Sequence, residues 1–166
     1  MGKYTHTEDK MSTPAQAAKM IRQDLKQAFP EVSFSVTSKR YSGGSSVSIA
    51  YENGPTCEAV DTLVGKYEYG HFDGMEDIYR YSNTAYDLPQ VKFVQVYRTT
   101  CETICQQVFA WLQKTHEHFD KVLSIDEAHN DLQRDYGAWT PREYISRILS
   151  KIDLTHGYTE PQGINI

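Results

Sequence analysis

The stretch Phe34–Tyr81, FSVTSKRYSGGSSVSIAYENGPTCEAVDTLVGKYEYGHFDGMEDIYRY, contains the alternation and the turn residues that decide the fold. Apolar and polar residues alternate over 32–39 and again over 46–52, which predicts two strands that each bury one face. The segment Tyr41-Ser42-Gly43-Gly44-Ser45 between them predicts the turn of a hairpin. Small hydroxyl residues occupy the other face of this hairpin, so we expect that face to be in water.

The second half of this stretch predicts a helix and further strands. Asn53-Gly54-Pro55 marks a turn, and Thr56 can cap a helix that runs to about Tyr67. A loop around Gly70 and Asp73-Gly74 then leads to a strand over 77–82. The β-forming residues of 91–97 predict one more strand.

Start signals place helices on both sides of this region. Ser12 or Thr13 can cap a helix with Pro14 at its first position, and Pro30 ends it. Thr99 with Glu102 predicts a capping box for a helix to about Phe119. A shorter helix is expected over 125–134. The segment Thr140-Pro141-Arg142-Glu143 predicts a second capping box, for a helix through Ile152.

The order of these elements predicts an α+β fold. We expect a mostly antiparallel sheet of about four strands, with an N-terminal helix, a crossover helix and C-terminal helices packed on it. Residues 1–11 are expected to be a disordered leader and 12–98 the α+β core. Residues 99–153 are expected to extend the same domain with helices, and 154–166 to form a tail.

Composition limits the class of protein. The 166 residues are 39% hydrophobic and 23% charged, which is typical of a soluble globular protein. Apolar runs are too short to span a membrane, and the polar N-terminus shows no secretory signal. Three cysteines form no disulfide framework, so we expect reduced thiols and a cytoplasmic location. The net charge of −5 disfavours a protein that wraps phosphate backbones, although residues 1–52 are slightly basic.

The glycine pair Gly43-Gly44 lies between two strands. Phosphate-binding glycines precede a helix N-terminus, so a flexible hairpin turn is the favoured interpretation. Its neighbours Lys39, Arg40 and Tyr41 nevertheless indicate a contact loop.

Two other clusters suggest chemistry that the sequence does not complete. Cys101 and Cys105 share a helical face, but a structural zinc site needs four ligands, so we interpret them as small core residues. His71 and Asp73 could act as an acid–base pair or bind a hard metal. No nucleophile or oxyanion donor accompanies them, which favours a solvated loop. We therefore predict no catalytic residue, no metal and no cofactor.

Tyrosine is unusually frequent, with twelve residues. Tyr79 and Tyr81 lie in the strand expected over 77–82, and Tyr41 lies in the hairpin. Tyrosines are enriched at protein interfaces, and their rings can also stack on unpaired bases. The alternative is that they are ordinary half-buried strand residues.

Several segments together resemble one known family, the large polyvalent protein-associated domain numbered twenty-nine, over about residues 13–98. The resemblance lies in Ala28-Phe29-Pro30, Phe34-Ser35-Val36, Tyr41-Ser42-Gly43-Gly44-Ser45, Gly54-Pro55-Thr56, Val60, Tyr67, Phe72-Asp73-Gly74-Met75, Asp77 and Tyr79-Arg80-Tyr81. It implies an α+β module of phage and mobile-element proteins, found beside DNA-handling and anti-restriction domains. It implies no reaction and no catalytic residues. The helices after Thr99 lie outside it.

These observations predict a non-enzymatic macromolecular binding module of phage or mobile-element type. One form of this hypothesis is an anti-defence factor that acts by protein–protein contact. The predicted binding residues are Lys39, Arg40, Tyr41, Gly43, Gly44, His71, Asp73, Tyr79 and Tyr81. One alternative is a nucleic-acid-binding accessory domain that uses Lys39, Arg40 and the helix bearing Lys19, Arg22 and Lys26. The second alternative is an enzyme that uses His71, Asp73 or the Tyr41 loop.

Overall fold

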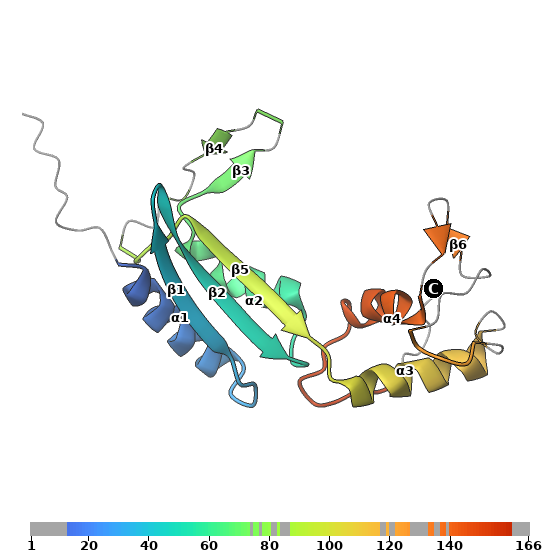
Figure 1. Cartoon of the computed structure of the whole chain (residues 1–166). Helices are drawn as coiled ribbons and strands as arrows, with labels where there is room; N and C mark the ends of the chain where they lie inside the picture. The colour runs from blue at the N-terminus through green and yellow to red at the C-terminus, as the bar shows by residue number, and fades with distance from the viewer. Residues whose placement is uncertain are drawn as a thin grey trace, which may run out of the picture. The chain divides into compact units, whose positions relative to one another are not determined.

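The structure is a computed structural model of the whole chain (Figure 1). It describes residues 13–73, 75–76, 78–80, 83, 87–116, 119, 122–126, 133–134, 137–138 and 140–160. The leader expected over 1–11 lies outside these residues. The chain divides into two compact units: unit 1 is Met1–Tyr51 with Glu58–Tyr97, and unit 2 is Glu52–Cys57 with Arg98–Ile166.

Unit 1 is built on a three-stranded sheet in the order β1-β2-β5. Its strands are β1 (Ser35–Tyr41), β2 (Gly44–Glu52) and β5 (Phe93–Thr99). β1 and β2 form the predicted antiparallel hairpin. β2 and β5 point the same way in Figure 1, and Lys92 N donates to Ser45 O at the start of both strands. A helical crossover between them makes this parallel pairing possible.

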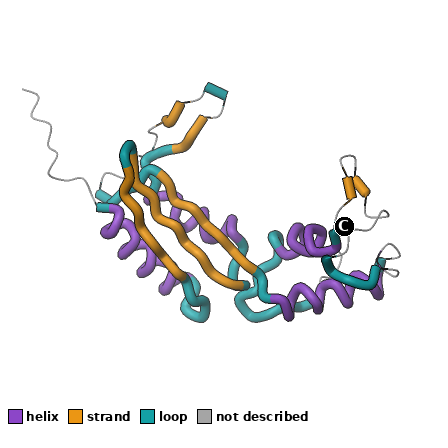
Figure 2. The backbone as a smooth tube through the Cα atoms, viewed as in Figure 1, coloured by secondary structure: helices purple, strands orange, loops and turns teal. Residues whose placement is uncertain are grey.

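Two helices cover one face of this sheet, as Figures 1 and 2 show. α1 (Pro14–Ala28) begins with a capping box between Thr13 and Gln16, which confirms the predicted start. α2 (Cys57–Val64) continues into a 3₁₀ turn, Gly65–Tyr67. The core between helices and sheet contains Ala17, Ala18, Ile21, Leu25, Val36, Val47, Ile49, Tyr51, Val60, Val64, Tyr67 and Val91. The alternation in the hairpin therefore predicted the buried face correctly.

The strand predicted over 77–82 is part of a separate two-stranded ribbon. β4 (Ile78–Arg80) pairs with β3 (His71–Asp73), and this pair lies apart from the three-stranded sheet in the hydrogen-bond order. The interpretation of 71–73 as a loop is wrong, because these residues pair antiparallel with β4 in the register His71↔Arg80 and Asp73↔Ile78. The α+β class is confirmed.

Unit 2 packs α3 (Glu102–Thr115) against α4 (Pro141–Leu149). The capping box between Thr140 and Glu143 is confirmed. The one predicted at Thr99 is wrong, because Thr99 still belongs to β5 and Cys101 caps α3 without a side-chain bond.

The helix expected over 125–134 is also wrong at both ends. Ile125 and Asp126 form a turn, and Gln133–Arg134 is a short strand, β6, paired with β7 (Gly137–Ala138). Ile125 O accepts a hydrogen bond from Arg142 N, which fixes this turn to the start of α4.

Arg98 holds the Asn53-Gly54 turn within unit 2. Its Nε donates to Asn53 O at 2.7 Å, and its Nη2 donates to Gly54 O at 2.9 Å. The same guanidinium donates to Leu149 O and Ile152 O at the end of α4. Asn53 and Gly54 both have a positive φ, 56° and 65°. A charged fork on four carbonyls therefore fixes a turn whose backbone geometry few residues accept.

Candidate functional site: the open face of the sheet

The sheet of unit 1 has one face that carries no helix. Pairing places the open-face residues of β1 and β2 opposite one another, as in Thr37↔Ser48 and Lys39↔Ser46. Ser48 Oγ lies 3.4 Å from Gln95 Oε1, which places alternate residues of β5 on the same face. We call this surface the open face: Ser35, Thr37, Lys39, Tyr41, Gly44, Ser46, Ser48, Ala50, Phe93, Gln95 and Tyr97.

Aromatic rings stand out from this face at two ends. The Tyr41 side chain is 39% exposed at the hairpin end, and Tyr97 is 52% exposed near the other end of β5. Phe93 lies on β5 two pleats before Tyr97 and is half-buried. Two exposed tyrosine rings on one regular sheet face offer contact area at little entropic cost, so this surface is a candidate for contact.

A lysine organises the hairpin end of the face. Lys92 Nζ lies 5.5 Å from the centroid of the Tyr79 ring and 5.6 Å from that of Phe93, within cation–π range. Its Nζ also lies 3.4 Å from Gly43 O. A Cβ at position 44 would stand 2.9 Å from Lys92 Cδ and 3.2 Å from the Tyr41 ring, so Gly44 leaves the room in which both side chains lie.

Tyr79 connects the β3–β4 ribbon to the sheet. Its hydroxyl donates to Lys92 O at 2.7 Å, and its ring meets Phe93 edge to face with centroids 5.7 Å apart. Tyr79 is therefore half-buried and anchors the ribbon, and its ring contributes only in part to the exposed surface.

Arg80 pairs with two described acidic residues of the ribbon. Arg80 Nε lies 3.1 Å from Asp73 Oδ2, and Arg80 Nη2 lies 2.5 Å from Glu76 Oε2. Asp73 Oδ1 also accepts from Met75 N, which is the turn chemistry expected of Asp73. Both carboxylate oxygens of Asp73 thus have structural partners within the ribbon.

Two further acidic groups of unit 1, Asp24 and Glu68, have hydrogen-bond partners of their own. Burial opposes ionisation of Asp24, but hydrogen bonds from Lys66 and Tyr67 outweigh it and keep the pKa of this carboxyl below its usual value. Burial raises the pKa of Glu68, even though its Oε1 accepts from Val94 N at 2.6 Å. These carboxyl groups therefore do not lie among the open-face side chains.

The structure brings together most of the predicted binding residues. Tyr41, Gly44 and Tyr79 meet around Lys92, and Lys39 lies on the same face of β1. Arg40 is also exposed, but strand alternation places it on the opposite face. His71 takes part in β3, and nothing is described of its side chain; Tyr81 lies outside the described residues.

Three contributing residues were missed from sequence: Lys92, Phe93 and Tyr97. The polar-apolar alternation of Phe93, Gln95 and Tyr97 against Val94 and Val96 was the available signal. It became informative only once the partner strand was known, because either face of β5 could have been the buried one.

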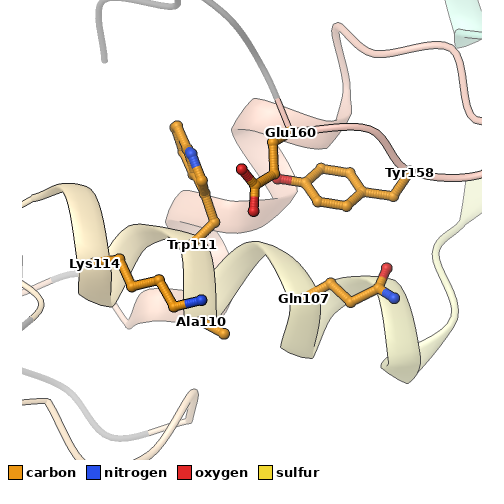
Figure 3. Close-up of a pocket in the computed structure, with 6 residues that line it drawn as sticks. All are labelled: Gln107, Ala110, Trp111, Lys114, Tyr158 and Glu160. Carbon is orange, nitrogen blue, oxygen red and sulfur yellow. The ribbon is translucent and has the colours of Figure 1, made fainter.

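Unit 2 contains a pocket of about 350 Å³, near the lower end of the volumes of small-ligand sites (Figure 3). Its lining comes from α3 and the segment after α4: Gln107, Ala110, Trp111, Lys114, Tyr158 and Glu160. Burial and the nearby Glu160 raise the pKa of Tyr158, so its phenol is a donor at neutral pH rather than a base. The pocket thus offers polar contacts around a Trp ring.

Packing accounts for Cys101 and Cys105. Cys105 is buried in the core of unit 2, and Cys101 packs against it. Within the described ranges, His, Cys, Asp and Glu residues do not gather into a group of three or more that could hold a metal ion. None of the described helices has the length and apolar character needed to cross a membrane.

Comparison with known proteins places the chain in a family. The family model described as large polyvalent protein associated domain 29 matches residues 12–119. This match confirms the resemblance and extends it through α3, so the expectation that the helices after Thr99 lie outside it is wrong for α3. Neither the curated proteins nor the solved structures yielded a match. The chain belongs to the large polyvalent protein associated domain 29 family.

Proposed function

We propose that this chain is a non-enzymatic binding module that holds an extended macromolecular partner across the open face of unit 1. The observation that carries the proposal is the combination of Tyr41 and Tyr97, both exposed, on a strand surface of hydroxyl and amide side chains. Rigid rings on a regular sheet provide contact area at little entropic cost.

The polyvalent-protein setting of the family supports this proposal. We propose that the module serves phage or mobile-element proteins, where it contacts a host or phage macromolecule in the cytoplasm. An anti-defence role through protein contact, expected from the resemblance, belongs to the same proposal.

A matched pair of double variants tests the proposal. Tyr41→Ser/Tyr97→Ser removes two exposed rings from the open face, while Lys19→Ser/Lys26→Ser removes two exposed side chains from α1, on the covered side. The measurement is the protein and nucleic acid captured from native-host lysate by tagged full-length chain.

The tyrosine variant should lose most of the captured material, and the lysine variant should keep it. Equal capture by both variants would show that the open face is not the contact surface.

A further inference from the structure

The open face differs in charge from the chain as a whole, because its charged residues are basic. Lys39 and Lys92 lie at its hairpin end, whereas Arg40 alternates to the opposite face of β1. None of its eleven defined residues is acidic; Glu52, the next β2 residue on this side, lies at the opposite end from the turn. The net charge of −5 therefore does not describe this surface. An anionic partner matches it locally.

The rings and polar groups of the face are arranged for a strand-like partner. Phe93 and Tyr97 are four residues apart on β5, about 13 Å at the usual rise of a strand. Gln95 lies between them, and Ser46 and Ser48 lie on the neighbouring strand. Rings alternate here with hydrogen-bonding groups, whereas an apolar protein interface would continue the hydrophobic area.

We propose that the open face binds single-stranded nucleic acid, with unpaired bases on Tyr41, Phe93 and Tyr97 and phosphates near Lys39 and Lys92. This inference rests on the proposed function and names its partner. Every base has a π-face, so stacking on such rings is tolerant of sequence, while the two lysines attract the backbone. A duplex keeps its bases stacked and cannot use the rings.

Fluorescence anisotropy of the full-length chain with labelled 20-nucleotide oligo(dT), oligo(rU) and a 20-base-pair duplex tests the inference. Single strands should bind at least about tenfold more tightly than the duplex, and their affinity should fall as salt rises. Tyr97→Ala should weaken single-strand binding about tenfold. The exposed position of Tyr97 allows this change without disturbing the core.

Two charge-matched variants locate the site. Lys39→Glu, on the open face, should weaken binding about tenfold and flatten its salt dependence. Lys26→Glu, exposed on α1, should change it less than twofold. If Lys26→Glu weakens binding as much as Lys39→Glu, the contact runs along α1 and the inference is overturned.

Two further outcomes separate this inference from the proposed function. If the oligonucleotides do not bind at 50 mM salt, while capture from lysate still depends on Tyr41 and Tyr97, the partner is a protein and the proposed function stands. If neither assay depends on the open face, both proposals fail.

Discussion

Two glycine turns at the ends of β2 have opposite structural roles. In the hairpin turn, Gly43 has a φ of 90° and is exposed, and its carbonyl faces Lys92 Nζ at 3.4 Å. In the turn after β2, Gly54 has a φ of 65° and is buried, and its carbonyl accepts from both Leu154 N and Arg98 Nη2. The first turn borders a surface, while the second is a structural anchor.

The comparison shows that the turn residues determine the backbone conformation, whereas distant residues determine how strongly the turn is held. Glycine adopts a positive φ at both positions without the steric penalty of a Cβ. What distinguishes them is the set of donors that reach the carbonyls, and Arg98 comes from 44 residues away in the chain. The stability of a turn therefore depends on residues that the turn sequence does not contain.

Arg98→Met should have the largest effect. It removes the donors to four backbone carbonyls, those of Asn53, Gly54, Leu149 and Ile152. We expect a loss of about 3 kcal/mol in the free energy of unfolding, because partly buried carbonyls lose their partners. Urea unfolding measures it.

Arg147→Met on the exposed side of α4 is the control, with a change below about 0.5 kcal/mol. Equal stability of the two variants would show that the hydrogen bonds of Arg98 do not stabilise the Asn53-Gly54 turn.

Substituting each glycine compares the turns directly. Gly54→Ala should cost about 2 kcal/mol, because an L residue is strained at this φ and the hydrogen-bonded backbone cannot relax. Gly43→Ala should cost about 1 kcal/mol, since its φ is also strained but the space around it is open. Thermal or urea unfolding gives both values. A larger loss for Gly43→Ala than for Gly54→Ala would contradict the distinction.

The residues that precede the two glycines provide a third test. Asn53 Oδ1 accepts from Cys101 N at 3.0 Å, at the cap of α3. Asn53→Ala removes this acceptor and also places Ala at a φ of 56°, so it should cost at least about 1 kcal/mol of unfolding free energy. Asn53→Asp keeps an acceptor and a side chain that tolerates this φ, so it should change the free energy by less than about 0.5 kcal/mol. Ser42→Ala in the hairpin turn should also stay below about 0.5 kcal/mol, because Ser42 is exposed. A Ser42→Ala loss matching that of Asn53→Ala would argue against the assigned roles.

The smallest effect is a pH dependence near the anchored turn. Hydrogen bonding by Thr155, including its N–H at 2.8 Å from Asp153 Oδ1, lowers the pKa of Asp153 against the effect of burial, and Arg98 and His156 add to the shift. A depressed pKa in the folded state gives stability that is present above the unfolded pKa and lost as pH falls through the folded one.

Asp153→Asn should thus cost no more than about 0.5 kcal/mol at pH 7, with the difference shrinking as pH falls below the ordinary pKa of an aspartate. Urea unfolding at several pH values provides the comparison. A difference that grows toward low pH would reverse the assigned sign.

Local patterns predicted the elements of unit 1 apart from β3, and the caps of α1 and α4. Thr13-Pro14 and Thr140-Pro141 combine a capping hydroxyl with proline at the first helical position, and both helices begin there. The Thr99–Glu102 pattern failed because β5 continues through Thr99 and the Asn53 side chain bonds the Cys101 N–H. That interaction joins segments 48 residues apart and leaves no local trace.

The candidate site was predicted in part for the same reason. The hairpin residues Lys39–Gly44 were identified from local turn chemistry. Lys92 was not, because its contacts with Gly43 O and the Tyr79 ring depend on the crossover that brings β5 beside β2. Tyr97 needed the same pairing before its exposed side could be known.

The burial of Cys105 has a kinetic consequence. Its side chain lies in the core between α3 and α4, and burial raises the pKa of its thiol, whereas Cys57 and Cys101 are only half-buried. Alkylation needs an accessible thiolate. Cys105 should therefore react only during the brief openings of the α3–α4 core, and the rate at which an alkylating reagent labels this native thiol would time those openings.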